Sequence, residues 1–406
     1  MKRVLATLAA SASIAWAGSV FAGAPDSGLD FAMGKALFDR MWVQAPSSTA
    51  ANDGLGPLFN EKSCASCHTG KAFSAAMTIG PDGGITARGL SVRLGNATGE
   101  ADPVYGRQIQ PRSANGIISE GSVAYRVEGT PPRVVPSFEP ARGPLAPGIH
   151  MGPRQAPPLR GISALGAVDP AAVERIAAEQ KARGAGPSGR PRFVERDGKR
   201  VLGRYGWKAS APTIDAQTAD ALGLDIGMSS PLFPHPYGDC TPAEADCLAA
   251  PNGRSAEFDG EEISNDMIRV LAVYVEGLKA PAPRPDTRGE ALFASAGCAA
   301  CHVPDMPALG GGTVRIFSDL LLHDMGAELD DGVGEPGVLS SEWRTAPLLT
   351  LSTRRAPDRR YLHDGRAATI ADAVLAHGGE AAAARSNFEA LPDGDRAALI
   401  AYLETL

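Results

Sequence analysis

Apolar residues recur at helical spacing in four short segments, and the segments form two matching pairs. Gly34–Phe38 reads G-K-A-L-F and Gly289–Phe293 reads G-E-A-L-F. Leu271–Leu278 and Leu399–Leu406 share the pattern L-x-x-Y-x-E-x-L. This spacing predicts amphipathic helices, and the repetition predicts two similar units. We expect each unit to have an entry helix that is crossed by a closing helix.

The first unit is longer because it carries an insertion at about residues 80–205. Strands are predicted near Tyr105–Gln110 and Gly121–Val127, and a helix at about Pro170–Arg183. Residues 129–160 are rich in proline, which predicts mostly loop. The expected fold is therefore mainly α, with a long, loop-rich, partly β insertion in the N-terminal half.

The boundaries of the units follow from two segments of distinctive composition. The proline-rich run 281–285 is a stiff linker that separates a unit at 23–280 from one at 286–406. Residues 1–22 combine a basic start, a short apolar stretch and a small-x-Ala cleavage site, as a signal peptide does. We expect an exported protein with no stable membrane span.

The net charge of the chain bears only on its possible partners. The formal net charge is −7, and removal of Lys2 and Arg3 with the signal peptide would make it −9. An acidic protein is a poor partner for nucleic acid or anionic membranes, but it suits a basic electron-donor protein.

The chemistry is concentrated in two C-x-x-C-H motifs. They are Cys64-Ala65-Ser66-Cys67-His68 and Cys298-Ala299-Ala300-Cys301-His302. This motif attaches haem c through its two cysteines, and its histidine is the proximal iron ligand. A zinc site would need a second Cys pair close to each first pair. The sequence therefore predicts two cytochrome c-like domains, with His68 and His302 as iron ligands, in the periplasm.

Two further cysteines lie outside the motifs. Cys240 and Cys247 flank a short turn-forming stretch. In an oxidising compartment we expect a disulfide between them.

Several long segments together resemble the bacterial di-haem oxidoreductase family, whose members are labelled thiol oxidoreductases or peroxidases. The family is related to di-haem cytochrome c peroxidases and to the di-haem enzyme MauG. The segments that carry the resemblance are 54–60, 203–209, 320–326, 342–348, 361–366 and 371–380. The resemblance implies a redox enzyme with two haems. The thiol label has no support in the residues, because haem attachment uses four cysteines.

The resemblance also assigns roles near the C-terminal haem. His377 matches the position of the sixth iron ligand, which is a Met in the peroxidases and a Tyr in MauG. This implies a bis-histidine haem, with Met325 or His323 as alternative ligands. His363 matches a residue that supports this haem without binding its iron, and Trp207 matches a Trp between the two haems.

At the N-terminal haem the resemblance implies an open iron with groups that transfer protons. His150 lies in a segment similar to the peroxidases' distal loop, although its spacing to the following Arg is shorter. Asp225 is the carboxylate nearest to the position of the peroxidases' catalytic Glu, and it is a shorter acid. Met151, Met228 and His235 remain alternatives that would cap this iron.

The peroxidases also bind calcium between their domains. The matching positions here, Gln155, Asp358 and Arg360, carry different residues, although backbone carbonyls can still bind Ca²⁺. The leading hypothesis is a peroxidase that takes electrons from a small redox protein, a cytochrome c or a cupredoxin, and passes them to an oxidant such as hydrogen peroxide. The alternatives are a di-haem electron-transfer cytochrome and a MauG-like oxidase of a partner protein or metal.

Overall fold

The computed structural model describes residues 27–70, 74–196, 198–353 and 359–406. The predicted signal peptide therefore lies outside the described residues. Within them, no helix combines the length and the apolar character that a membrane span requires.

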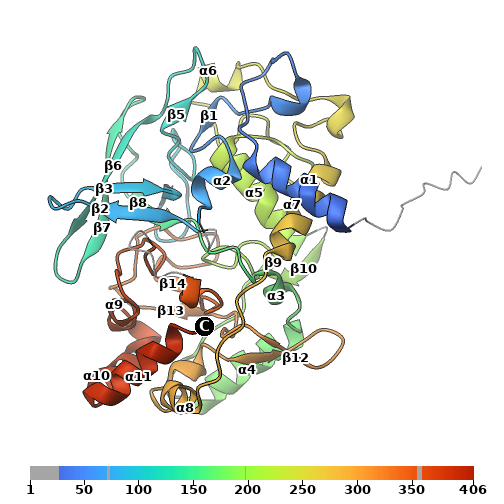
Figure 1. Cartoon of the computed structure of the whole chain (residues 1–406). Helices are drawn as coiled ribbons and strands as arrows, with labels where there is room; N and C mark the ends of the chain where they lie inside the picture. The colour runs from blue at the N-terminus through green and yellow to red at the C-terminus, as the bar shows by residue number, and fades with distance from the viewer. Residues whose placement is uncertain (1–26, 71–73, 197, 354–358) are drawn as a thin grey trace, which may run out of the picture.

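Helices and strands both build the molecule (Figure 1). The helices are α1 (Ser27–Asp39), α2 (Cys64–Cys67), α3 (Ser163–Gly166), α4 (Pro170–Arg183), α5 (Ile214–Ala221), α6 (Ala245–Leu248), α7 (Asn265–Gly277), α8 (Thr287–Ser295), α9 (Ile370–Leu375), α10 (Ala382–Ala390) and α11 (Asp393–Leu403). Helix covers 31% of the chain and strand 21%, so the fold is mixed rather than mainly α.

The strands form small antiparallel two-stranded sheets. They are β1 (Leu58–Phe59) with β5 (Arg112–Ser113), β2 (Ala76–Ile79) with β3 (Ile85–Arg88), β4 (Leu90–Gly95) with β8 (His150–Gln155), β6 (Gly121–Glu128) with β7 (Arg133–Pro140), β9 (Phe193–Arg196) with β10 (Lys199–Leu202), β11 (Asp305–Pro307) with β12 (Thr313–Arg315), and β13 (Leu322–Asp324) with β14 (Glu342–Arg344).

The predicted helix pairs cross as the repeat requires. α1 packs against α7, and α8 packs against α11. The first glycine of each repeat lies at the crossing: a Cβ on Gly34 would come within 2.7 Å of Tyr274 Cβ, and one on Gly289 within 2.2 Å of Tyr402 Cβ. Only glycine allows such a close approach, so the repeated Gly and Tyr are two halves of one packing contact.

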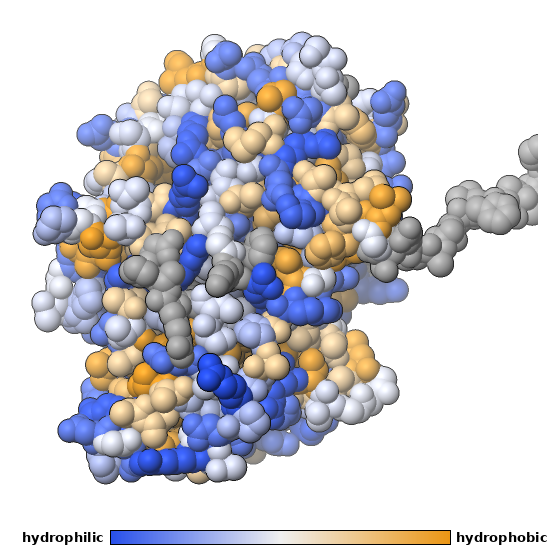
Figure 2. All heavy atoms as spheres, viewed as in Figure 1, coloured by the Kyte–Doolittle hydropathy of each residue, from blue (hydrophilic) through white to orange (hydrophobic). Residues whose placement is uncertain are grey.

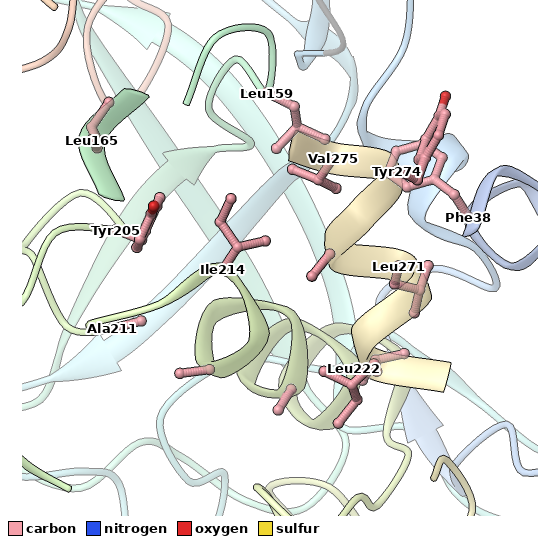
Figure 3. Close-up of a cluster of buried hydrophobic side chains, with 14 of the residues drawn as sticks. Phe38, Leu159, Leu165, Tyr205, Ala211, Ile214, Leu222, Leu271, Tyr274 and Val275 are labelled. Atoms are coloured by element: carbon pink, nitrogen blue, oxygen red, sulfur yellow. The ribbon is translucent and has the colours of Figure 1, made fainter. Parts of the chain in front are cut away.

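The largest cluster of buried apolar residues is built on α7. Ser264 caps this helix by accepting a hydrogen bond from Met267 N at 3.2 Å. Figure 3 shows Leu271 and Val275 of α7 directed toward Leu222 and Ile214, which follow or belong to α5. This core positions the segment after α5, which lines the functional site described below.

The insertion differs from the prediction in two places. The helix predicted at 170–183 is confirmed as α4, which Asp169 caps and Gly184 ends in a left-handed conformation. The strand predicted at 105–110 is wrong, since this segment forms a turn with isolated bridges. The predicted loop at 129–160 is also wrong, because it contains β7 and β8. Val134, Pro136 and Phe138 of β7 point inward while the residues between them are exposed, which is the alternation of a strand. The prolines in this segment made that alternation hard to recognise in the sequence.

The insertion also contacts the C-terminal unit, and α4 lies beside α8 in Figure 1. Gln180 Nε2 donates to Ala300 O at 3.0 Å and to Asp319 Oδ2 at 3.1 Å. The predicted disulfide between Cys240 and Cys247 is present. On the face drawn in Figure 2, hydrophilic and hydrophobic side chains are interspersed.

Candidate haem sites and the cavity between them

One cavity of about 1710 Å³ is lined by both C-x-x-C-H motifs. All four motif cysteines, His68 and His302 line it, and so do Trp207, His363 and His377. Pockets for a single small molecule measure roughly 300–1,000 Å³. The cavity is therefore large enough for more than one cofactor, and it joins the two places where the sequence predicts them.

The first motif forms the short helix α2. Ser63 caps it by accepting from Ser66 N at 3.2 Å, and His68 N donates to Cys64 O at 2.9 Å. Burial raises the pKa of Cys64 to about 12 and also raises the pKa of Cys67 well above its usual value. These thiols are therefore not set up as thiolates for zinc or for thiol exchange.

The second motif orients its histidine with a backbone carbonyl. His302 Nδ1 lies 3.1 Å from Phe317 O. Burial and the neighbouring His377 lower the pKa of His302 to about 4, so the ring is neutral at pH 7. A neutral ring that donates from Nδ1 has its lone pair on Nε2, which is the arrangement of a metal ligand.

His377 faces His302 across the cavity. Their ring centres lie 6.5 Å apart, and the ring planes are inclined by 50°. His377 Nδ1 lies 2.7 Å from Ala373 O, and burial lowers the pKa of His377. Two metal–nitrogen bonds of about 2.0–2.1 Å plus two ring radii span roughly 6 Å. The separation is therefore that of two imidazoles sharing one metal ion.

Of the two alternative ligands, Met325 lines the cavity, whereas His323 is engaged elsewhere. Its Nε2 lies 3.0 Å from Asp319 Oδ2, and its Nδ1 lies 2.7 Å from Glu380 Oε2. Burial opposes the charge, but these two carboxylates and Cys301 raise the pKa of His323 to about 12. Cys301, Asp319 and His323 are close enough to share a cation, but both ring nitrogens of His323 already have carboxylate partners.

Two tryptophans line the middle of the cavity. Trp207 Nε1 donates to Gln155 O at 2.8 Å. Trp343 stacks on His363 with ring centres 3.9 Å apart and planes inclined by 11°. Lys208 Nζ lies 3.9 Å from the centre of the Trp343 ring. His363 is thus fixed beside the cavity by stacking, and burial lowers its pKa well below the usual value.

Lys208 is a residue that sequence reasoning missed. It is fully buried and donates to Leu339 O, Ser340 O and Glu342 O at 2.8–2.9 Å. Burial lowers its pKa to about 7. In the sequence, only its position next to Trp207 could have drawn attention to it.

Asp225 reaches the cavity near the first motif. It lies in a π-helical turn, Leu222–Ile226, that continues α5. Gln108 Nε2 donates to Asp225 Oδ1 at 2.8 Å, and Asn60 N and Glu61 N donate to Asp225 O at 2.8 and 3.1 Å. The backbone of Asp225 is therefore held to the segment that leads into the first motif, and its carboxylate is held by Gln108. Gln108 was not singled out from the sequence, because its partner lies 117 residues away.

His150 lies apart from this site. It begins β8, is exposed, and packs near Gly332 rather than lining the cavity. The structure therefore does not bring it together with Asp225. Met151, Met228 and His235, the alternative ligands of the first iron, are described residues that also lie outside the cavity lining.

At the candidate calcium position, the side-chain amide of Gln155 donates to backbone carbonyls. Gln155 Nε2 donates to Arg360 O at 3.3 Å and to Leu362 O. The Arg360 carbonyl that calcium would use therefore has a hydrogen-bond donor against it. Asp358 lies outside the described residues.

The residues around the cavity fit two covalently attached haems. Each end has a pair of cysteines with an adjacent histidine, and the second end has an opposed neutral histidine at metal-sharing distance. These groups, imidazole nitrogens to bind iron and paired thiols for covalent attachment, are those that haem c requires.

Comparison with known proteins agrees with this chemistry. A family model described as "Di-haem oxidoreductase, putative peroxidase" matches residues 144–406. No curated protein matches the chain significantly. Among solved structures, the chain is similar to hydrazine synthase from Kuenenia stuttgartiensis, with 14% identity, 100% coverage of both chains and a TM-score of 0.31. That score is too low to support an inference.

Proposed function

The chain belongs to the di-haem oxidoreductase family and is therefore an enzyme; on this premise we propose that it is a periplasmic peroxidase with two haems c. Cys64 and Cys67 attach one haem, and Cys298 and Cys301 attach the other. When bound, haem supplies electron transfer at a six-coordinate iron and oxidant binding at an open one.

The difference between the two ends of the cavity carries this proposal. At the second end, His377 opposes His302 at 6.5 Å, which supports a six-coordinate, low-spin iron. At the first end, the candidate capping residues Met151, Met228 and His235 do not line the cavity, whereas Asp225 does. An open iron beside a carboxylate favours an enzyme over a simple electron carrier.

The residues of the chain then have distinct tasks. A small redox protein, a cytochrome c or a cupredoxin, delivers electrons at the C-terminal end, and Trp207 lies on the route to the N-terminal end. Asp225 accepts the proton of peroxide that lies nearer the iron and returns it to the leaving oxygen. Two electrons and two protons convert one hydrogen peroxide into two water molecules. Gln108 holds Asp225 in place, and His150 is given no task here because it does not line the cavity.

Electron paramagnetic resonance on the holoprotein tests the proposal. We expect a low-spin ferric signal from the C-terminal haem, and a high-spin signal from the N-terminal haem that changes when peroxide is added. The signals are recorded in both the oxidised and the half-reduced states, so that the ligation of each iron is observed in each. Two low-spin signals in both states would instead support the electron-transfer cytochrome.

Turnover distinguishes the peroxidase from a MauG-like oxidase. A peroxidase consumes peroxide steadily with a reduced small redox protein as donor. A MauG-like enzyme would show the high-spin signal but turn over only with its own protein or metal substrate.

A further inference from the structure

Eight arginines line the cavity, and two of them differ from the rest. The eight are Arg93, Arg107, Arg112, Arg154, Arg160, Arg192, Arg344 and Arg385. Six have carboxylate or carbonyl partners: Arg107 pairs with Asp239, Arg112 with Glu61, Arg154 with Asp331, Arg192 with Glu335, and Arg160 and Arg344 donate to backbone carbonyls. Within the described part of the chain, the guanidinium groups of Arg93 and Arg385 have neither kind of partner.

Arg93 lies at the end of the cavity that contains the first motif. It belongs to β4, and the residue before this strand touches the motif: a Cβ on Gly89 would lie 2.6 Å from Cys67 O. The charged groups that act on Arg93 are Asp225, Arg154, Glu335 and Arg107, and burial lowers its pKa. The guanidinium of Arg93 is therefore surrounded by both positive and negative groups and makes no direct hydrogen bond to any of them.

Arg385 lies at the other end, beside the second motif. It belongs to α10, which packs on the residues just before Cys298. Asn387 Nδ2 donates to Ala296 O at 3.3 Å, and a Cβ on Gly297 would lie 3.7 Å from Ala384 Cβ. The Nε atom of Arg385 is buried without a hydrogen-bond partner. Each motif thus has one unpaired arginine nearby, on an element packed against it.

A guanidinium that lines a cavity without an acceptor gains most from a carboxylate that can accept two parallel N–H bonds. Haem carries two propionate carboxylates. The thioether bonds hold only the opposite, vinyl-derived side of the ring, so the propionates need partners of their own. We propose that Arg93 and Arg385 bind the propionates of the haems attached at the first and second motif, respectively.

This inference rests on the proposed function, because it requires both haems. A cation beside a propionate offsets its negative charge and so favours the reduced haem. Each arginine therefore raises the reduction potential of its own haem. The pairing of one arginine with one haem also lets the two potentials be set separately.

Potentiometric titration of the holoprotein tests the inference, with each haem followed by its own spectrum. In Arg93→Gln we expect the redox equilibrium constant of the N-terminal haem to shift about tenfold toward the oxidised form, which is 59 mV for one electron. The C-terminal haem should change little. Arg385→Gln should give the reverse pattern, and Arg93→Lys should recover most of the shift because it keeps the charge.

Arg107→Gln is the matched control, since Arg107 lines the same cavity but pairs with Asp239 at 3.2 Å. Unchanged potentials in both Gln variants would overturn the inference. A shift of the same size in the reduction potential of Arg107→Gln would also overturn it. So would Gln variants that changed only the binding of added inorganic anions. Pyridine haemochrome spectra, which count the haems, distinguish failure of this inference from failure of the proposed function. Fewer than two haems in the unmodified protein would contradict the proposed function itself. If a Gln variant fails to fold, Arg93→Leu or Arg385→Leu, which also removes the charge, replaces it in the same titration.

Discussion

The rings of His302 and His377 face each other at 6.5 Å, although 75 residues separate them in the chain. Each ring donates from Nδ1 to a backbone carbonyl, Phe317 O for His302 and Ala373 O for His377. Both rings are therefore oriented before any metal binds. This arrangement gives the most direct spectroscopic prediction.

Replacing His377 with Ala should open the sixth position of the C-terminal iron. We expect its low-spin signal in electron paramagnetic resonance to become high-spin, while the N-terminal haem keeps its signal. His377→Met should stay low-spin with a higher potential, because a His/Met pair raises the potential of haem. His235→Ala is the control, since His235 lies outside the cavity lining. An unchanged low-spin signal in His377→Ala would contradict the assignment.

Replacing Lys208 with Met should destabilise the protein strongly. The three N–H bonds of the ammonium group match three carbonyl acceptors, at Leu339, Ser340 and Glu342. Methionine would leave these carbonyls buried without donors, at a cost of about 3 kcal/mol or more in the free energy of unfolding. Urea unfolding measures this cost.

Lys199 is the control for that experiment, because it is an exposed lysine on β10. Lys199→Met should change the free energy of unfolding by less than about 0.5 kcal/mol. Equal effects of the two substitutions would show that Lys208 does not hold the 339–342 segment.

Glu120 should make the stability of the protein fall as the pH rises. Burial raises the pKa of this carboxyl from 4.5 to about 9. Between these values the folded state keeps a proton that the unfolded state loses. The stabilisation is therefore complete below about pH 4.5 and is lost as the pH rises toward 9.

Glu120→Gln removes this dependence. We expect the variant to match the unmodified protein near pH 4.5 and to exceed it by at least ~1–2 kcal/mol at pH 8. Chemical denaturation across this range provides the measurement. Glu128→Gln, on the exposed side of the same hairpin, should leave the pH profile unchanged. A constant difference between Glu120→Gln and the unmodified protein at every pH would refute the argument.

Local patterns predicted the parts of the fold that depend on neighbours in sequence. α4 was predictable because Asp169, Pro170 and Gly184 mark its ends, and the helix crossings followed from the repeated Gly and Tyr. β7 and β8 were missed because they are stabilised by pairing with β6 and β4, which are distant or not evident in the local sequence. Their proline content suggested loop instead.

The candidate site was predictable to a similar extent. The C-x-x-C-H motifs located both ends of the cavity, and the family resemblance led to His377. It also led to His150, which is the exposed first residue of β8 and does not line the cavity. The unpaired state of Arg93 and Arg385 depends on what surrounds them in space. No sequence pattern distinguishes them from the paired arginines.

Asp225 should carry proton transfer, and Gln108 should position it. Asp225→Asn removes the base but keeps the shape, so we expect kcat/KM for hydrogen peroxide to fall by about 10²–10⁴. Gln108→Leu leaves the carboxylate in place without its 2.8 Å hydrogen bond, and misplacement of a reacting group costs up to about 10². We therefore expect a loss of roughly 10- to 100-fold in kcat, with little change in KM for hydrogen peroxide.

Gln110→Leu separates positioning from general packing. Gln110 is also a buried amide and donates to Leu224 O at 2.6 Å, but Asp225 is not among its partners. We expect this variant to keep its kcat even if its stability falls. Asp225→Glu keeps the acid and should retain much more activity than Asp225→Asn. If Gln110→Leu lowered kcat as far as Gln108→Leu, the hydrogen bond to Asp225 would not be the cause. Another group on the cavity wall would then have to move the proton of peroxide, and Asp220, which also lines the cavity, is the next carboxylate to replace.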